Sequence, residues 1–369
     1  MKVIKTFIFY PLSYIYRFVV NVRNNMFDLK LLKSTEFSLP VISVGNITVG
    51  GTGKTPTVEY LVELLKPSFK VAVLSRGYKR KTKGFFLSTI DSTVEEIGDE
   101  PLQIKLKFPE ITVAVCESRV TGIQTLIDMN IGIQVLILDD AFQHRYVKPG
   151  LSILLYDYTQ PFLEDHFLPY GRLRENPNQR HRADIILVTK TPEGIKPIDM
   201  RILATNLTLK PYQNLFYSKI NYKGLMPVFQ NELFSLDVNS IREKNFSVVL
   251  VTGIGNPKPL VDYCENISKE IVPLHFGDHY QYTDKDIRMI MTVFNEIPNK
   301  NKIIVTTEKD AVRFRILDIP DAQIKKSFFY YAIEMMILNN EKKDFNDRVL
   351  TYVKRSGDQY RFIVTKRQY

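Results

Sequence analysis

Hydrophobic positions in the first half of the chain fall into short, continuous runs that are separated by helical patterns. The runs lie at 41–45, 70–75, 111–116, 135–139, 151–157 and 184–189. They are rich in β-branched residues, and amphipathic segments such as 55–65 and 119–129 lie between them. Continuous apolar strands that alternate with helices are typical of an α/β fold with a doubly wound, mostly parallel sheet. Ligands bind beyond the carboxyl ends of such strands, so we expect functional residues directly after these runs.

The pattern changes near residues 217–228, where alternation with glycine and proline indicates a linker or hairpin between domains. A second alternating block follows, with strands expected at 247–252, 271–275, 302–306 and 328–332. At about 150 residues per domain, a chain of 369 residues suits two domains. We expect an N-terminal helical segment over 1–35, a larger α/β domain over 36–215, linker strands over 216–230 and a smaller α/β domain over 231–369. A returning strand near the C-terminus could complete the linker.

The strongest motif follows the first strand, where residues 48–55 read TVGGTGKT. It fits the P-loop pattern GxxxxGK[ST] except that Thr48 stands in place of the first glycine. Glycines let the backbone approach phosphates, Lys54 reaches the β- and γ-phosphates, and the Thr55 hydroxyl ligates Mg²⁺. The alternative is a glycine-rich turn with an incidental lysine, which the flanking strand and helix disfavour. We therefore predict an ATP-binding loop made of Thr48, Val49, Gly50, Gly51, Thr52, Gly53, Lys54 and Thr55.

An acidic pair, Asp139 and Asp140, ends the strand at 135–139. A P-loop needs an acid at the end of a nearby strand to hold Mg²⁺ or its water, and adjacent carboxylates are unfavourable without a neutralising cation. One of the two could instead cap a helix or form a turn. We favour at least one of them as a metal-shell residue.

Four further residues are candidates for the functional site, although a structural role is the simpler interpretation of each. Asp99 lies in GDEP, which by itself is a turn or helix-capping signal. His279 follows a predicted strand of the second block, and a carboxylate–histidine pair can accept a proton from an attacking hydroxyl. Arg174 and Glu175 precede the strand at 184–189, where a solvated surface pair is the simpler interpretation. The sequence has no His/Cys metal cluster, and its Thr–Lys and Glu–Lys–Asp segments do not match the guanine-recognition motif of GTPases.

Composition narrows the class of partner. The net charge of +10 favours an anionic partner: nucleic acid, a phosphorylated substrate or an anionic membrane. No nucleic-acid-binding module is recognisable. Residues 7–20 are apolar and aromatic but interrupted by Pro11, Ser13 and Arg17, so the run is too short and broken to span a bilayer. A helix lying in a membrane interface and a first helix packed on the domain both fit it. The two cysteines lie far apart, which suits a reducing compartment.

Taken together, the motifs resemble the tetraacyldisaccharide 4'-kinase family, the lipid A 4'-kinases of Gram-negative bacteria. The matching segments, in family order, lie at 44–56, 74–78, 98–101, 138–145, 168–175, 251–257, 276–283 and 305–313. They span nearly the whole chain. Threonine at the first P-loop position is itself a trait of this family, so Thr48 supports the resemblance.

The resemblance implies that ATP with Mg²⁺ phosphorylates the 4'-hydroxyl of a tetraacylated glucosamine disaccharide 1-phosphate, giving lipid IVA. It implies a P-loop domain, a smaller α/β domain and a two-stranded linker. It also implies a peripheral enzyme, held on the cytoplasmic face of the inner membrane by its N-terminal segment; we expect a monomer and no nucleic acid partner. Lys54 and Thr55 would bind phosphate and Mg²⁺, with Asp99 as the base paired with His279.

For the remaining site residues, the resemblance implies that Asp139 and Asp140 organise Mg²⁺, while Arg174 and Glu175 contact the γ-phosphate and the metal shell. Two positions depart from the family pattern: Ala141 replaces a glycine, and Arg172 stands in a segment that often reads Pro–Leu–Arg–Glu. Arg172 is a candidate extra phosphate contact. A P-loop kinase or ligase of a soluble metabolite, or a nucleotide-switched binding protein, remains the alternative.

Overall fold

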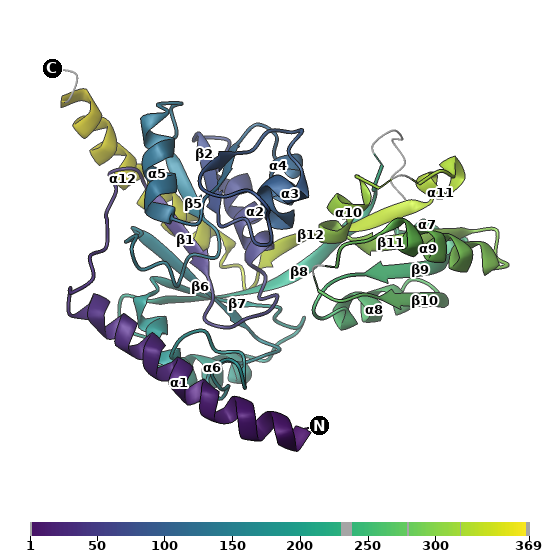
Figure 1. Cartoon of the computed structure of the whole chain (residues 1–369), viewed down its shortest axis with the longest axis horizontal. Coiled ribbons are helices and arrows are strands. Elements are labelled where there is room, and N and C mark those ends of the chain that lie inside the picture. The colour runs from purple at the N-terminus through teal and green to yellow at the C-terminus, as the bar shows by residue number, and fades with distance from the viewer. Residues whose placement is uncertain (1, 230–237, 279, 318, 367–369) are drawn as a thin grey trace. The chain divides into compact units, whose positions relative to one another are not determined.

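The computed structural model describes residues 2–229, 238–278, 280–317 and 319–366 (Figure 1). The chain forms two compact units. Unit 1 comprises Met1–Ile220 and Met335–Tyr369, and unit 2 comprises Asn221–Glu334. The chain leaves unit 1 along strand β8 (Asn214–Pro227) and returns along strand β12 (Phe328–Ile337). The fold is α/β, and its strands form a large, mostly parallel mixed sheet.

The strands of unit 1 lie in the order β8-β7-β6-β1-β5-β2-β4-β3. Neighbours from β8 to β4 pair in parallel, and only the short β3 at the edge pairs antiparallel. Each of the six strands expected in this half occurs within one residue of its predicted bounds. The remaining bounds are β1 (Val41–Gly45), β2 (Val71–Ser75), β3 (Phe86–Leu87), β4 (Thr112–Val115), β5 (Val135–Leu138), β6 (Leu151–Asp157) and β7 (Ile185–Thr189).

Helices cover both faces of the unit 1 sheet, because the strands are apolar on both sides. One face packs against α2 (Lys54–Leu65), α4 (Asp99–Lys107) and α12 (Lys342–Lys366). The other face packs against α5 (Arg119–Asp128), α6 (Pro197–Leu207) and the N-terminal helix. Short α3 (Val94–Ile97) precedes α4, and the 3₁₀ helix η1 (Pro177–Arg182) precedes β7. This two-sided packing is what the continuous apolar runs predict.

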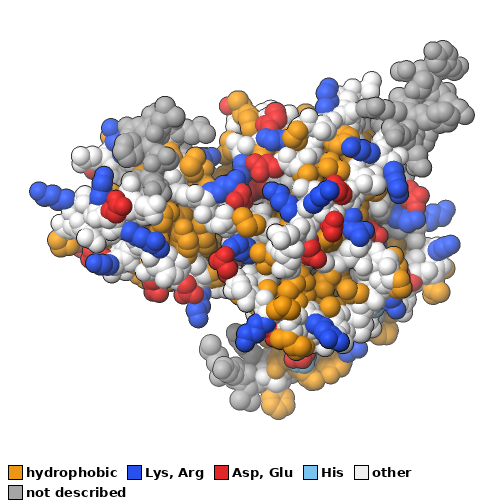
Figure 2. All heavy atoms as spheres, turned by 180° about the vertical axis from the view of Figure 1, so that it is seen from behind, with side chains coloured by type: hydrophobic (Ala, Val, Ile, Leu, Met, Phe, Trp, Pro, Cys, Tyr) orange, Lys and Arg blue, Asp and Glu red, His pale blue; other side chains and the backbone are white. Residues whose placement is uncertain are grey.

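The N-terminal helix α1 (Lys2–Asp28) is one continuous helix with Pro11 inside it. Its inner side contacts unit 1 on the face that also carries α6 (Figure 1). Its outer side exposes large apolar side chains, among them Phe7 at 78% and Phe18 at 69%, and Figure 2 shows apolar side chains gathered along this lower edge. Within the described residues, none of the helices combines the length and apolar character needed to cross a bilayer.

Helix α12 belongs to unit 1, although residues 231–369 were expected to form the C-terminal domain. Its apolar residues Phe345, Val349 and Val353 are buried in the same core as β1 and α2. The Tyr352 hydroxyl donates to the backbone oxygen of Val41, 3.0 Å away, and accepts from its N–H at 2.9 Å. These contacts correct the predicted boundary, since β12 carries the chain back before α12 begins.

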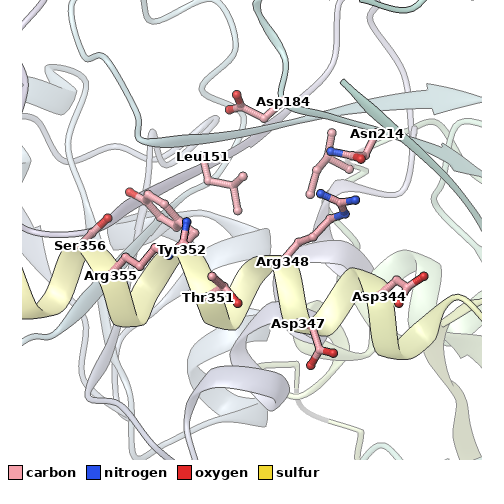
Figure 3. A pocket seen from close by; sticks show the side chains of 11 residues that line it. Leu151, Asp184, Asn214, Asp344, Asp347, Arg348, Thr351, Tyr352, Arg355 and Ser356 are labelled. Carbon is pink, nitrogen blue, oxygen red and sulfur yellow. The ribbon is translucent and has the colours of Figure 1, made fainter. Parts of the chain in front are cut away.

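An open groove of about 720 Å³ runs along α12 at the amino ends of β6, β7 and β8 (Figure 3). Leu151, Asp184 and Asn214 line it from the sheet, and Arg348 and Tyr352 line it from the helix. The P-loop follows the carboxyl end of β1, so this groove lies at the opposite edge of the parallel sheet. Ligands of such sheets bind beyond the carboxyl ends of the strands.

Unit 2 is a smaller α/β unit with strand order β10-β9-β11-β12, all paired in parallel. Its predicted strands are confirmed, but β12 runs five residues further than expected as it leads back to unit 1. Helices α9, α10 and α11 pack on one face of these strands, and α7 and α8 on the other. The bounds are α7 (Val238–Glu243), β9 (Ser247–Thr252), α8 (Lys258–Glu265), β10 (Glu270–His275), α9 (Asp284–Glu296), β11 (Lys302–Thr307), α10 (Glu308–Phe314) and α11 (Ala322–Lys326).

Candidate active site

The glycine-rich loop connects the end of β1 to the first residue of α2, as the sequence predicts. Gly50 and Gly53 have φ angles of 111° and 87°, in the left-handed region that disfavours side chains. The Thr189 hydroxyl at the end of β7 donates to the Thr52 carbonyl oxygen, 2.8 Å away, which supports the loop from the neighbouring strands. The backbone N–H groups at the start of α2 and its positive dipole end therefore form the kind of site that binds phosphate.

Lys54 is the first residue of α2 and points to the end of β5. Its Nζ lies 3.8 Å from Oδ1 of Asp140, and Arg174 Nη1 donates to both carboxylate oxygens of Asp140 at 2.9 and 3.0 Å. Burial acts to raise the pKa of Asp140, but Lys54 and Arg174 outweigh it and hold this pKa below its ordinary value. Two cations and one carboxylate thus meet beside the P-loop, a suitable arrangement for a ligand that brings further negative charge.

Asp139 is buried more deeply, at 1% exposure. Its Oδ2 accepts a hydrogen bond from the Ser75 hydroxyl at 3.3 Å, while Oδ1 has no hydrogen-bond partner among the described residues. Burial, then the nearby Glu100 and Asp140, raise its pKa to about 7. Glu100, at the start of α4, thus acts electrostatically on Asp139 at the end of β5. A buried carboxyl oxygen without a partner is unfavourable for folding alone, and marks a place for a ligand or metal.

Asp99 is buried in the first turn of α4, directly after Gly98. Gly98 has φ 89°, and a Cβ there would lie 2.9 Å from the carbonyl oxygen of Tyr78, so only glycine lets the two loops approach this closely. The two motifs at 74–78 and 98–101 therefore meet in unit 1. His279, the partner predicted for Asp99, lies outside the described residues.

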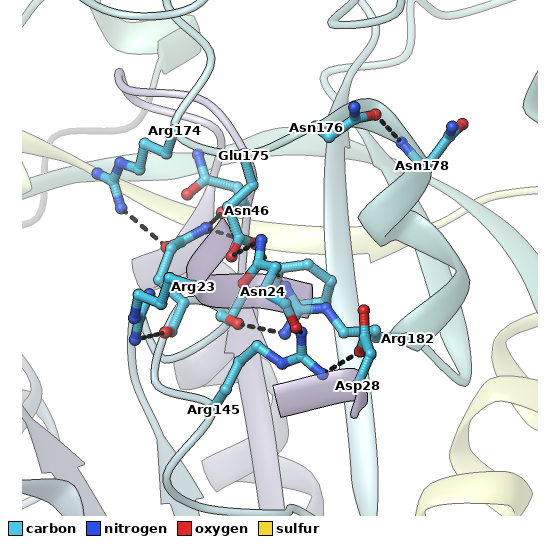
Figure 4. A network of polar contacts seen from close by, with 12 residues as sticks. Arg23, Asn24, Asp28, Asn46, Arg145, Arg174, Glu175, Asn176, Asn178 and Arg182 are labelled. Atoms are coloured by element: carbon cyan, nitrogen blue, oxygen red, sulfur yellow. Dashed lines mark hydrogen bonds and ion pairs between the residues drawn. The ribbon is translucent and has the colours of Figure 1, made fainter. Parts of the chain in front are cut away.

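Glu175 contacts a different set of side chains from Arg174 (Figure 4). It is 1% exposed, and its carboxylate accepts from Asn24 of α1 at 3.2 Å, from Gln143 at 3.5 Å and from Arg182. Among the described residues, no group of three or more His, Cys, Asp or Glu side chains converges to hold a metal. The role of Glu175 in a metal shell therefore stays a prediction.

The two departures from the family pattern have simple structural explanations. Ala141 is buried with an ordinary backbone angle; the positive φ of this turn, 46°, falls on Asp140. The methyl group of Ala141 is thus tolerated without strain. Arg172 forms an ion pair with Asp165, at 2.7 Å, and also contacts Gln160. The proposed extra phosphate contact of Arg172 would therefore compete with a partner already in place.

Sequence reasoning missed several residues that order this site. Arg119 is buried under the acidic pair and donates to the carbonyl oxygens of Cys116 and Asp139. Gln143 and Arg182 surround Glu175, and Asn24 reaches it from α1. Gln143 lies inside a matched segment and could have been noticed there. The other three carry no local signal, because their partners are distant in the sequence.

The fold and the loop define the class: an α/β protein of the P-loop type, with its glycine-rich loop at the carboxyl end of β1 in a mostly parallel sheet. A family model described as Tetraacyldisaccharide-1-P 4'-kinase matches residues 5–354. The chain therefore belongs to the tetraacyldisaccharide-1-P 4'-kinase family, and its activity is that of a tetraacyldisaccharide 4'-kinase in lipid A biosynthesis.

Similar proteins agree with this assignment. A tetraacyldisaccharide 4'-kinase of Bacteroides thetaiotaomicron is 46% identical over 94% of this chain and 92% of its own length. A relative of the same name from Phocaeicola vulgatus is 44% identical over 96% of both chains. A solved structure of the "apo" form of LpxK from Aquifex aeolicus, in complex with ATP, matches with a TM-score of 0.71 at 29% identity, over 93% of this chain and 97% of the other. The family resemblance read from the motifs is confirmed.

Proposed function

We propose that unit 1 binds ATP through its P-loop and that the chain transfers the γ-phosphate to the 4'-hydroxyl of a membrane-held tetraacyldisaccharide 1-phosphate. The observation that carries this proposal is the meeting of Lys54, Arg174 and Asp140 at the start of α2. A solved relative in complex with ATP supports the choice of nucleotide. We also infer that unit 1 is the P-loop kinase domain, unit 2 the smaller domain, and β8 with β12 the two-stranded linker.

Phosphoryl transfer asks mainly for positioning and charge neutralisation. Lys54 and the backbone of residues 48–53 would hold the β- and γ-phosphates, with Arg174 supplying a second cation for the transferring group. In the state described here both cations face Asp140, so the bound nucleotide would compete with that carboxylate for them. Asp99 would accept the proton of the attacking hydroxyl, with His279 as its partner.

The oxygen donors beside the P-loop fit Mg²⁺. This ion binds one or two carboxylates together with waters and substrate phosphates, and does not need a cage of protein ligands. The unpartnered Oδ1 of Asp139 is the observation that suits it. We propose that Thr55, Asp139 and Asp140, with Glu175 in the outer shell, would hold it. When bound, Mg²⁺ would neutralise charge on the β- and γ-phosphates.

We propose that α1 lies in the surface of an anionic bilayer, on the cytoplasmic face of the inner membrane. Its outward apolar side chains and the exposed cations Arg17, Lys30 and Lys33 suit such a surface. Arg23, another cation of α1, turns inward and donates to the carbonyl oxygen of Gln143 at 3.0 Å. The chain would act as a monomer, without nucleic acid, on a lipid that seldom leaves the bilayer.

The test of this proposal is incubation with labelled ATP and the tetraacyldisaccharide 1-phosphate, followed by separation of the lipid product. Lys54→Ala should abolish detectable transfer while the melting temperature stays unchanged, because the Lys54 ammonium lies 3.8 Å from the Asp140 carboxylate, too far for a close ion pair. Lys66→Ala, at the end of the same helix region in an exposed pair with Glu110, is the matched control and should keep full activity. Ordinary activity of Lys54→Ala would refute the phosphate-loop assignment.

A further inference from the structure

The inner side of α1 carries polar residues that contact the loop with Arg174 and Glu175, in addition to its apolar contacts. The Tyr16 hydroxyl donates to the carbonyl oxygen of Arg174 at 3.3 Å. Asn24 Nδ2 donates to Oε1 of Glu175 at 3.2 Å (Figure 4). Two neighbouring residues of one loop are therefore held by two donors from the same helix, two turns apart.

Burying the amide of Asn24 is unfavourable for folding, and a role of α1 as an anchor alone does not require it. Its side chain is 0% exposed, and its Oδ1 has no hydrogen-bond partner among the described residues. An apolar residue of similar size would pack at this position without burying an unpaired polar atom. The gain from asparagine is directional: its amide fixes one oxygen of Glu175, whose other oxygen accepts from Arg182 and Gln143.

Gln143 connects this cluster to the P-loop. Its Nε2 donates to the carbonyl oxygen of Asn46 at 2.8 Å, immediately after β1. Its own carbonyl oxygen accepts from Arg23 of α1 at 3.0 Å, and its Oε1 accepts weakly from Arg174 at 3.5 Å. The backbone that starts the P-loop, the loop with Arg174 and helix α1 thus share one partly buried hydrogen-bond network.

Arg174 connects this network to the residues beside the P-loop. Arg174 Nη1 bonds both oxygens of Asp140, which in turn faces Lys54. Tyr16 and Asn24 hold the backbone at Arg174 and the side chain of the next residue, and so fix the point from which the Arg174 side chain extends toward Asp140. Side chains one shell away from a reacting centre commonly set the orientation of those that touch it.

We propose that Asn24, assisted by Tyr16, is a positioning residue: α1 sets the orientation of Arg174, and through it Asp140, for phosphoryl transfer. The proposal rests on the function proposed above for the P-loop and Arg174. It gives α1 a second role besides contact with the lipid surface, and predicts that this role can be removed without loss of membrane binding.

The test compares Asn24→Ala with Asn25→Ala, which removes the same side chain from the exposed, neighbouring position of α1. Both variants are assayed in mixed micelles at saturating ATP and lipid, with rates expressed per folded molecule from thermal melts. We expect kcat of Asn24→Ala to fall about 10-fold with KM for the lipid unchanged, and Asn25→Ala to match the unaltered chain. Co-sedimentation with vesicles of phosphatidylethanolamine and phosphatidylglycerol should be the same for both.

Tyr16→Phe provides a second variant that keeps the ring and its packing but removes the donor to Arg174. We expect a smaller fall of kcat, about 3-fold, again without a change in KM for the lipid. A kcat within twofold of Asn25→Ala for both variants would overturn the proposal. So would a loss of activity that tracks loss of vesicle binding or of folded protein, because it would show that α1 only anchors or stabilises.

Lys54→Ala separates this proposal from the one on which it rests. If Lys54→Ala keeps its activity, the phosphate-loop assignment fails whatever Asn24→Ala does. If Lys54→Ala is inactive and Asn24→Ala behaves as Asn25→Ala does, only the positioning role is refuted.

Discussion

Both units bury an aspartate beyond the carboxyl end of a parallel strand, but the two carboxylates differ in how many hydrogen bonds they accept. In unit 2, Asp310 is 0% exposed and accepts from the Gly253 N–H at 2.8 Å, the Thr307 hydroxyl at 2.7 Å and Arg313 at 2.8 Å. In unit 1, Asp139 has one long hydrogen bond and an oxygen without a described partner. A buried carboxylate whose oxygens all accept hydrogen bonds suits a structural role. One that keeps an oxygen without a partner is suited to bind a ligand or metal ion.

Close packing around Asp310 brings residues of several family motifs together within unit 2. A Cβ on Gly253 would lie 2.9 Å from Oδ1 of Asp310 and 2.8 Å from the Tyr282 hydroxyl. Glycine is therefore required at this position by the approach of the acid. Three motifs, at 251–257, 276–283 and 305–313, therefore meet around Asp310.

The largest expected effect concerns Asp99. Like Asp310, it is buried in the first turn of a helix, but it is proposed to act as the catalytic base. We expect Asp99→Ala to lower kcat by about 10²–10⁴-fold, the scale of general acid–base catalysis, with little change in melting temperature. Steady-state kinetics at saturating substrate measures it, and the exposed Asp91→Ala is the control. Near-normal turnover of Asp99→Ala would show that this acid, like Asp310, has a structural role.

Asp310→Asn should act on stability. It removes the charge that pairs with the buried Arg313, and removing one partner of a buried ion pair costs about 3–5 kcal/mol. Urea denaturation should therefore show a clear fall in the free energy of unfolding of unit 2. A loss below about 1 kcal/mol would mean that the network around Asp310 is not the stabilising element inferred here.

Asp139→Asn should show the reverse behaviour. It replaces a buried, poorly satisfied carboxyl by a neutral amide, so the free energy of unfolding should stay the same or rise. Turnover should fall about 10²-fold, because the proposed metal shell loses a negative charge. The same denaturation and kinetic assays measure both. Destabilisation comparable to that of Asp310→Asn would remove the distinction between the two units.

The smallest effect concerns pH and His144 in unit 1. Burial, then Arg119 and Arg76, lower the pKa of His144 to about 4 from 6.5. Between these values the unfolded chain binds more protons than the folded one, so stability falls as the pH falls through this window, by up to about 3 kcal/mol at pH 4. His144→Asn should flatten the slope of unfolding free energy between pH 6.5 and 4. An unchanged slope in this variant would exclude His144 as its source.

The sequence determined the local parts of this protein. The continuous apolar runs predict six strands of unit 1 to within a residue, because burial on both faces permits no polar alternation. The P-loop is equally local: glycines at 50 and 53 meet the positive φ angles of one turn, and Lys54 follows at the helix start. Asp139 and Asp140 could be placed beside it, since parallel strands end at a common edge.

Only the tertiary structure decided which buried acids are satisfied and which are not. Asn24 and Glu175 are 151 residues apart, and no periodicity in either segment indicates that they meet. The return of α12 to unit 1 likewise depends on Tyr352 reaching Val41 across 311 residues. A hydrogen bond needs a donor and an acceptor within about 3 Å of each other, whatever their separation in the sequence. The sequence therefore specifies the donors and acceptors of this enzyme, and the packed sheet and helices decide how they combine.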